Sequence, residues 1–555
     1  MAYAIEKAQS EAEKAIGAKT RFSKPPQQEQ GDLASAIAFE KGRELKKNPK
    51  AIAEEMCAKA KMPAYFEKIS SLNGFINLYF SDAFYAEALA QALDKRYGDS
   101  EKFSGKYIVE FSQPNVGKPF HVGHIRSTIL GDSVANILET QGWKTIRMNY
   151  LGDSGNQVAK LLLALELFKD LPPATNEKRL LEYYVRIHKE IEANPELAEK
   201  TRVFLEKIES GDPETIKNVL SIRKKSYEAF QRNYDLLGVK FDEVVGESEF
   251  VAQAKKAVAE ALDKKIAFKD KGGEIVVKLE PELPNFILLR SNGTTLYSTR
   301  DLALANWKFE RFKFDQAVVF TSSEQNTYFK QIIRTLKLLG RKYAEHYKHV
   351  GFGLITLEEG KLSTREGRVV FLEDVLNDAI AYAKDEVIKR AHDYPKKEIN
   401  EIAKIVGIGA AKFAVLRITP ERNIMFNLKR IVNFDGDTGA YVQYTAVRSK
   451  SIIRKSGAPK IKADKDWKFN SQERSVVRLL ADYPLVLQNC ASSLSTHPLC
   501  NYLLELCAAF NTFYANTPVL EGGSERDKRI AIVSAVSHTL ENGLSMLGIK
   551  TPERM

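Results

Sequence analysis

The residues best suited to chemistry are His121 and His124, two imidazoles that flank Gly123. Imidazoles can donate hydrogen bonds to phosphoryl oxygens as negative charge develops on them. A glycine between them lets a flat base or a ribose approach the backbone closely. Four residues of this kind also recur by chance, and a histidine at the start of a helix is more often a cap or a surface residue. The pattern alone therefore indicates a nucleotide-phosphate site without establishing one.

A strand, a turn and a helix must position these histidines. The apolar run 107–111 predicts the strand, and Pro114, Gly117 and Pro119 break it. From Ile125 onward the apolar positions recur at helical spacing. This order points backbone N–H groups and the positive end of the helix dipole at a ligand above the strand.

Two other stretches carry candidate residues. Tyr297 and Asp301 are one helical turn apart and share a face if Ser298 opens a helix, although such a pair is often an ordinary surface contact. The segment 360–367 is a basic turn rich in Ser and Thr that follows the strand-like run 351–356. Taken alone, this turn fits a plain surface loop as well as a phosphate-binding loop.

Size and composition describe a globular protein of several domains. The chain has 555 residues and a mass of 62.5 kDa, which predicts three or four domains, and 44% of its residues are apolar. No apolar run approaches the roughly 20 residues that cross a bilayer. Glu11 and Glu13 near the start argue against a signal peptide. We therefore expect a cytoplasmic protein with no membrane partner.

The four cysteines, Cys57, Cys490, Cys500 and Cys507, show no C-x-x-C pairing. This spacing predicts neither a disulfide framework nor a protein-bound zinc ion, and no other metal site is expected. Buried small hydrophobic side chains are the simpler interpretation.

The charge is positive and unevenly distributed. The whole chain carries 83 Lys and Arg against 72 Asp and Glu, and the segment 411–470 alone has 13 basic and 5 acidic residues. A basic segment of this size favours a polyanionic partner such as nucleic acid. A solvated basic surface without a partner remains the alternative.

The pattern of predicted elements divides the chain into three parts. Residues 1–100 predict helices followed by a strand at 73–80, with Asp32 capping a helix that runs to Lys47. A second strand at 145–150 leads through a turn-rich loop into a helix. A charged, mostly helical insertion at about 171–290 follows, and nearly all of the chain after residue 371 predicts helices.

The motif resembles the signature of the class I arginyl-tRNA synthetases, His-Ile-Gly-His, with Val122 in place of Ile. The flanking residues from Glu110 to His124 and the end of the chain also match this family. The resemblance implies an α/β Rossmann-type catalytic domain at 101–410, interrupted by the insertion. It also implies an α+β domain at 1–100 that contacts the tRNA elbow, and an all-α anticodon-binding bundle at 411–555.

The same resemblance implies an arginine pocket. The implied arginine-binding residues are Glu110, Ser112, Asn115, His124, Tyr297, Asp301 and Gln325. A guanidinium has five donors in a rigid plane, so two carboxylates with aromatic and amide neighbours suit it well. Lysine would form fewer of these bonds and citrulline would leave the carboxylates unpaired, so both could be rejected without an editing site.

The segment 360–367 resembles the second class I signature, Lys-Met-Ser-Lys-Ser, which closes over ATP. Lys361, Leu362 and Ser363 match its first three positions, whereas Thr364 replaces the second lysine and Arg365 lies out of register. In the family a lysine before the histidine motif is thought to compensate, and Lys118 fits that position. The implied catalytic residues are His121, His124, Lys118, Lys361 and Ser363. The implied ATP-binding residues are His121, Gly123, His124, Lys361, Leu362, Ser363, Thr364 and Arg365.

For the carboxyl-terminal third the resemblance implies contact with tRNA through Tyr441, Gln443, Tyr444 and Arg448. Such aromatic and basic residues stack on and pair with unstacked bases. Tyrosines at helical spacing are more often core residues, which is the alternative for these positions.

These features and the resemblance predict an arginine–tRNA ligase that uses ATP with Mg²⁺ and acts on L-arginine and tRNA(Arg). The resemblance alone implies a monomer. A small-molecule nucleotidylyltransferase shares the histidine motif, but it would not need the basic helical third. A tRNA-binding paralogue without catalysis would be expected to lose the histidines or the guanidinium ligands, and both are present.

Overall fold

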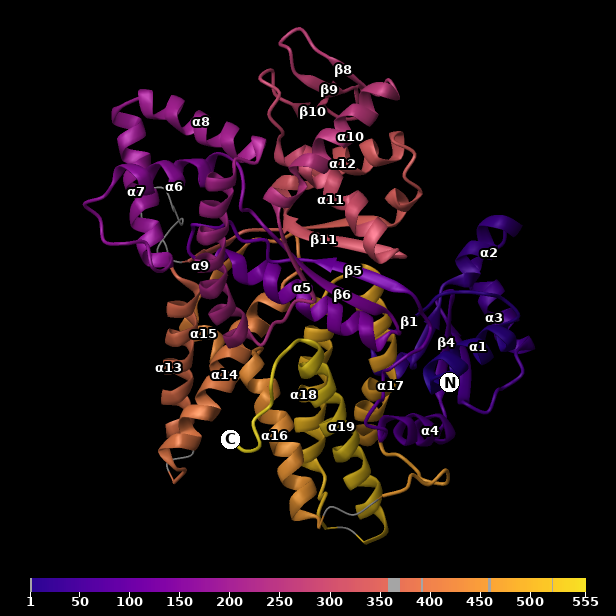
Figure 1. Cartoon of the computed structure of the whole chain (residues 1–555). Coiled ribbons are helices and arrows are strands. Elements are labelled where there is room, and N and C mark those ends of the chain that lie inside the picture. The colour runs from indigo at the N-terminus through magenta and orange to yellow at the C-terminus, as the bar shows by residue number, and fades with distance from the viewer. Residues whose placement is uncertain (1, 358–369, 391–392, 458–460, 522) are drawn as a thin grey trace.

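The computed structural model describes residues 2–357, 370–390, 393–457, 461–521 and 523–555. A central parallel sheet lies above a bundle of long helices, and a small α+β module packs against one side of both (Figure 1). The candidate loop residues Lys361, Leu362, Ser363, Thr364 and Arg365 lie outside the described residues.

The amino-terminal module is built on an antiparallel sheet with the strand order β1-β2-β4-β3. Its elements are α1 (Ala4–Ile16), β1 (Phe22–Ser23), β2 (Leu33–Ser35), α2 (Ile37–Leu45), α3 (Pro49–Lys59), β3 (Phe66–Leu72), β4 (Phe75–Phe80) and α4 (Asp82–Ala92). The prediction that Asp32 caps a helix running to Lys47 is wrong, because residues 33–35 form a strand. Asp32 instead accepts hydrogen bonds from the Phe80 amide and the Tyr85 hydroxyl.

The central sheet is parallel and has the order β12-β11-β5-β6-β7. Its strands are β5 (Lys106–Glu110), β6 (Lys144–Leu151), β7 (Glu243–Gly246), β11 (Gln316–Ser322) and β12 (Tyr347–Phe352). The chain order reverses between β5 and β11, and ligands bind parallel sheets at the carboxyl ends of the strands on either side of such a reversal. The predicted strand at 107–111 is therefore the innermost strand at the expected binding edge.

Side chains of β5 alternate between two cores. Tyr107 and Val109 pack into the core shared with α5, whereas Ile108 packs on the opposite side with α10, α11 and α12. Glu110 follows the same alternation as Ile108 and meets Lys308 of α11. The helices concerned are α5 (Gly123–Thr140), α10 (Val251–Asp263), α11 (Tyr297–Phe312) and α12 (Asn326–Leu338).

The expected insertion at 171–290 is divided in the structure by β7, which belongs to the central sheet. Before β7 lie α6 (Asn156–Leu167), α7 (Glu177–Ala193), α8 (Glu196–Ser210) and α9 (Pro213–Leu237). After α10 a separate antiparallel sheet has the order β10-β9-β8. Its strands are β8 (Ala267–Lys269), β9 (Ile275–Val277) and β10 (Phe286–Leu289). Strand β7 was not predicted, because a strand of four residues carries little periodic signal.

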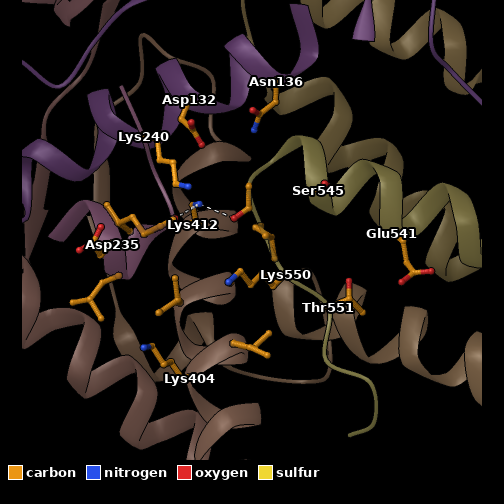
Figure 2. A pocket seen from close by; sticks show the side chains of 18 of the residues that line it. Asp132, Asn136, Asp235, Lys240, Lys404, Lys412, Glu541, Ser545, Lys550 and Thr551 are labelled. Carbon is orange, nitrogen blue, oxygen red and sulfur yellow. Dashed lines mark hydrogen bonds between the residues drawn. The ribbon is translucent and has the colours of Figure 1, made fainter. Parts of the chain in front are cut away.

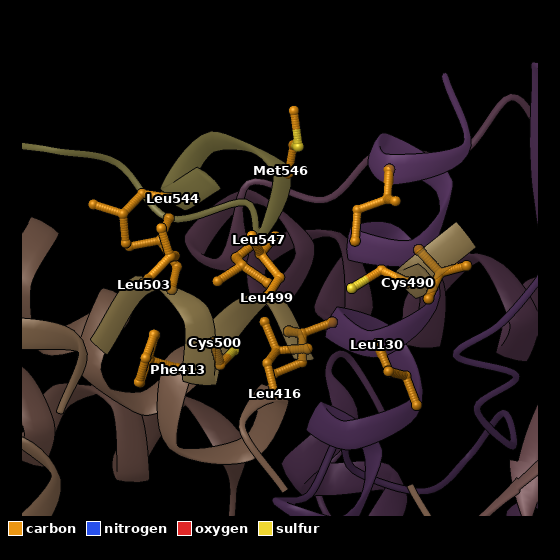
Figure 3. Packing of buried hydrophobic residues seen from close by; sticks show 14 of the residues in the cluster. Leu130, Phe413, Leu416, Cys490, Leu499, Cys500, Leu503, Leu544, Met546 and Leu547 are labelled. Carbon is orange, nitrogen blue, oxygen red and sulfur yellow. The ribbon is translucent and has the colours of Figure 1, made fainter. Parts of the chain in front are cut away.

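The chain after residue 371 forms a mostly helical bundle, as its pattern predicted. Its helices are α13 (Leu372–Arg390), α14 (Lys396–Leu416), α15 (Leu428–Ile431), α16 (Gly439–Lys455), α17 (Ser471–Ser493), α18 (His497–Asn516) and α19 (Arg526–Met546). Leu130 of α5 packs with Leu416, Leu499 and Leu547, so the bundle and the catalytic sheet share one core (Figure 3). A short parallel pair, β13 (Ile355–Leu357) and β14 (Ile424–Phe426), joins the two regions again.

The four cysteines are free, and Cys490, Cys500 and Cys507 are buried in this shared core. Burial raises the pKa of the Cys490 thiol to about 12. No helix in the described part of the chain is long and apolar enough to cross a membrane.

Candidate active site

The two histidines lie at the start of α5, after the turn that follows β5. Their ring centroids are 4.0 Å apart, and α5 begins at Gly123. A Cβ atom added at Gly123 would lie 2.8 Å from the His121 ring, so the missing side chain makes room for the neighbouring imidazole. The sequence proposed a different reason for this glycine, namely the approach of a ligand.

Backbone hydrogen bonds set the tautomer of both rings. His124 Nδ1 accepts from the His121 amide at 3.2 Å, and His121 Nδ1 accepts from the Gly123 amide at 3.1 Å. An accepting Nδ1 places the ring proton on Nε2. Burial and the nearby Lys118 ammonium lower the pKa of His121 to about 4, and burial lowers the pKa of His124 as well. At neutral pH both residues are therefore uncharged Nε2–H donors.

The segment that begins at Val370 is attached to the histidine motif. The Val122 amide donates to the Val370 carbonyl at 3.2 Å, and the Leu372 amide donates to the Phe120 carbonyl at 3.0 Å. Strand β13 ends at Leu357, immediately before residues 358–369. The end of the chain segment that follows residues 358–369 is thus fixed next to the histidines.

Arg126 links this motif to the helical bundle. Its buried guanidinium donates to the carbonyls of Gly353 (2.7 Å), Arg422 (2.5 Å) and Thr419 (2.9 Å). Gly353 precedes β13, and the other two acceptors lie between α14 and β14. The same helix turn that carries His124 therefore holds the approach to the ATP loop and the connection to the bundle.

The turn after β5 has an unusual backbone. Ser112 and Gln113 have φ values of 79° and 50°, a region that residues other than glycine rarely adopt. The Ser112 hydroxyl contacts Thr128 and Tyr234 at 2.9 Å, so it is already engaged inside the protein. Gln113 Nε2 donates to Glu110 Oε1 at 2.5 Å. Such local strain at the end of a strand is characteristic of a functional site.

Asp301 and Glu110 are brought to the same place. Burial, with the charges of Glu247 and Glu110, raises the pKa of the Asp301 carboxyl to about 7. The Tyr328 hydroxyl donates to Asp301 Oδ2 at 2.5 Å. A cation bound beside Asp301 would favour its ionised form and lower this pKa.

The other predicted arginine ligands surround this acidic cluster unevenly. Tyr297 is 53% exposed, and its ring lies 5.0 Å from that of Tyr328. Asn115 is exposed and pairs with Gly152 in an isolated bridge at the end of β6. Gln325 is exposed and directly precedes α12. These three side chains can therefore reach a ligand above the sheet edge.

Four residues of this site gave no clear signal in the sequence. Lys308 forms a buried ion pair with Glu110, and its Nζ also donates to the Tyr347 hydroxyl at 2.9 Å. Glu247 pairs with Arg300 at 3.2 Å. Lys308 follows Asp301 by two helical turns, which is the one available hint. Tyr328, Tyr347 and Glu247 come from other elements, and no local pattern connects them.

We expect arginine binding to weaken below neutral pH. If Asp301 binds the guanidinium as predicted, it must be ionised, so below a pKa of about 7 binding must first remove a proton, and affinity should fall up to about tenfold per pH unit. Above pH 8 affinity should be constant. Calorimetric titration with arginine from pH 5.5 to 8.5 measures this, and at pH 6 it should detect close to one proton released. A flat profile that matches that of Asp301→Asn would contradict the assignment.

The predicted tRNA residues on α16 lie in different surroundings. Tyr441 accepts a hydrogen bond from Asn511 at 2.9 Å, and Arg448 lies over the Tyr514 ring at 4.7 Å. Tyr444 is half-buried beside Phe434. Gln443 is fully buried.

The buried Gln443 amide donates to the backbone carbonyls of Lys550 (2.7 Å) and Ile405 (3.4 Å). These bonds attach the end of the chain to α14. We therefore correct its assignment from tRNA contact to a structural role.

A cavity of about 1210 Å³ lies away from this site, at the junction of α5, α9, α14, α19 and the carboxyl-terminal tail (Figure 2). Lys412 crosses it and donates to the carbonyls of Leu237 (2.8 Å) and Gly548 (2.6 Å). Burial lowers the pKa of Lys412 to about 8. Basic and acidic side chains line the cavity in equal number, so its charge favours no ligand class.

Known protein families match three parts that together cover almost the whole chain. Residues 1–80 match the arginyl tRNA synthetase N-terminal domain, residues 87–428 match the catalytic domain of class I (R) tRNA synthetases, and residues 442–555 match the DALR anticodon binding domain. The arginine–tRNA ligase of Clostridioides difficile is 37% identical over 541 residues, which is 96% of this chain and 95% of that protein. The arginine–tRNA ligase of Halothermothrix orenii is 37% identical over 540 residues, which again cover 96% of this chain and 95% of that protein.

Solved structures agree with these matches. Thermus thermophilus arginyl-tRNA synthetase superposes with a TM-score of 0.84 at 28% identity, covering 100% of this chain and 99% of that one. Arginyl-tRNA synthetase from Plasmodium falciparum, at 23% identity and a TM-score of 0.85, shares the fold over the same extent. The chain therefore belongs to the class I arginyl-tRNA synthetases, the enzymes that ligate arginine to tRNA in protein synthesis.

Proposed function

We propose that this chain activates L-arginine with ATP and transfers it to the 3′ end of tRNA(Arg), with Asp301 as the principal guanidinium ligand. The observation that carries the assignment of the amino acid is the largely buried carboxylate cluster of Asp301, Glu110 and Glu247 at the sheet edge. Guanidinium is the cation whose planar donors suit such a cluster best. Tyr297, Asn115 and Gln325 supply the surrounding aromatic and amide groups.

We assign ATP to the edge formed by His121, Gly123, His124 and Lys118, together with the loop that carries Lys361, Leu362, Ser363, Thr364 and Arg365. The arginine carboxylate attacks the α-phosphate in line, and pyrophosphate leaves. The Nε2–H groups of the two histidines donate to phosphoryl oxygens as they gain charge. Mg²⁺ enters with the ATP phosphates, because magnesium usually keeps phosphate and water ligands.

In the second step a hydroxyl of the terminal adenosine attacks the activated carbonyl, and AMP leaves. We assign Tyr441, Tyr444 and Arg448 to anticodon contact and residues 1–100 to the tRNA elbow. The division at 101–410 and 411–555, a monomeric state and a cytoplasmic location belong to the same proposal. Family resemblance and the basic segment 411–470 support it.

Pyrophosphate exchange tests this function. Labelled pyrophosphate should enter ATP only when both arginine and tRNA are present, and none of the other 19 amino acids should replace arginine. A nucleotidylyltransferase would exchange without an amino acid, and a non-catalytic paralogue would bind tRNA without exchange. Either result would remove the proposal.

A further inference from the structure

Lys308 is a fully buried lysine in the acidic cluster, although an arginine site needs no cation of its own. Its position on α11 is two helical turns after Asp301, so both side chains leave the same face of the helix. Burial of an ammonium is costly unless it is paired and hydrogen-bonded. The residue is therefore held there by specific partners.

Those partners come from two strands that are not neighbours. Lys308 forms its ion pair with Glu110 on β5 and donates to the Tyr347 hydroxyl on β12 at 2.9 Å. Strand β11 lies between these two strands in the sheet. The lysine thus spans β11 and fixes the carboxylate of Glu110 from one side, while Gln113 holds its other oxygen.

Among the described residues, two of the three carboxylates in the cluster are already paired with a cation of the protein, and one is not. Glu110 is paired with Lys308, and Glu247 is paired with Arg300, which also contacts Glu209 at 3.2 Å. Within the described part of the chain, no ion pair is found for Asp301, which accepts a hydrogen bond from the Tyr328 hydroxyl. One ionisable carboxylate is left for one substrate cation.

We propose that Lys308 is a specificity-determining residue that excludes unbranched ω-amino acids such as lysine and ornithine by placing an ammonium beside Glu110 in advance. An ammonium is a compact point charge that needs a free carboxylate, and Glu110 is already paired with a like charge. A guanidinium instead binds Asp301 through paired N–H donors that lie in its molecular plane. Rejection of lysine then comes from repulsion as well as from missing hydrogen bonds.

The test compares arginine and lysine as substrates for tRNA-dependent pyrophosphate exchange, and it rests on the function proposed above. In Lys308→Met the KM for arginine should rise about tenfold with a smaller change in kcat, and kcat/KM for lysine should rise about tenfold. The preference for arginine over lysine should therefore fall about 100-fold. Lys308→Arg keeps the charge and should keep the rejection of lysine.

Lys308→Gln protects the test against a folding defect, because an amide can still bond Glu110 and Tyr347 without a charge. It should lose selectivity as Lys308→Met does. Lys337→Met, which removes an exposed lysine from α12, is the matched control and should behave as the wild type. Equal losses for arginine and lysine, with the preference unchanged, would overturn the proposal. Absence of exchange in the wild type would instead remove the proposed function.

Discussion

Asp301→Asn is expected to lower kcat/KM for arginine by about 10³-fold, which is ~4 kcal/mol, because a charged pair in a buried site contributes on the order of 2–5 kcal/mol. The amide keeps the shape of the side chain and a hydrogen bond with Tyr328, but it cannot neutralise a guanidinium. The loss should appear mainly in the KM for arginine, whereas the KM for ATP should stay within about twofold. Steady-state exchange kinetics with each substrate varied in turn measures both values.

The matched control for this prediction is Glu310→Gln. It makes the same carboxylate-to-amide change on the exposed side of the same helix, away from the acidic cluster. Its kinetics should be those of the wild type. If Asp301→Asn retained arginine activity within tenfold, the guanidinium would have to be recognised elsewhere, and the assignment of the amino-acid pocket would be lost.

His121→Asn and His124→Asn should each lower the rate of arginine activation by about 10²–10³-fold, the usual effect of removing one preorganised donor. Asparagine can replace the Nδ1 acceptor that the backbone amides use, but it does not reach the position of the Nε2–H donor. The losses should therefore lie in kcat, with arginine and ATP binding little changed. Single-turnover measurement of adenylate formation separates chemistry from binding.

Glutamine at the same positions is the informative comparison, because its amide N–H lies near the place of the histidine Nε2. His121→Gln and His124→Gln should retain more activity than the asparagine variants. The wild-type rate should also be independent of these histidines between pH 6 and 9, since the pKa of His121 is about 4. Equal loss in the asparagine and glutamine variants would show that the imidazoles act by some means other than Nε2 donation.

Local patterns in the sequence predicted the elements that hold the site. Strand β5, the start of α5 and the helix at Tyr297 lie within a few residues of their predicted bounds, because apolar periodicity and helix breakers act over short distances. Relations between distant segments could not be predicted from local patterns, and only the family resemblance brought Glu110 and Asp301 together. β7 is too short to show a period, and Glu247 reaches the cluster only through η2 (Glu247–Phe250), next to that strand.

Burial was the second source of error. A glutamine on a basic helix is typical of an RNA contact, but Gln443 faces inward because the end of the chain folds back over α16. The residues after Asp32 were predicted to begin a helix, yet pairing with β4 makes residues 33–35 a strand. In both cases a contact more than forty residues away in the sequence overrides the local preference.

The firm attachment of the amino-terminal module to α17 has a consequence for substrate selection. Arg474 joins this module through Glu67 (2.8 Å) and Asp82 (3.0 Å), and Tyr97 donates to the Leu480 carbonyl at 2.9 Å. The apolar residues of both parts form one continuous cluster. If residues 1–100 bind the tRNA elbow and α16 binds the anticodon, as proposed above, the distance between these two binding surfaces is set by the protein. An RNA whose elbow and anticodon are a different distance apart would then contact only one of the two surfaces.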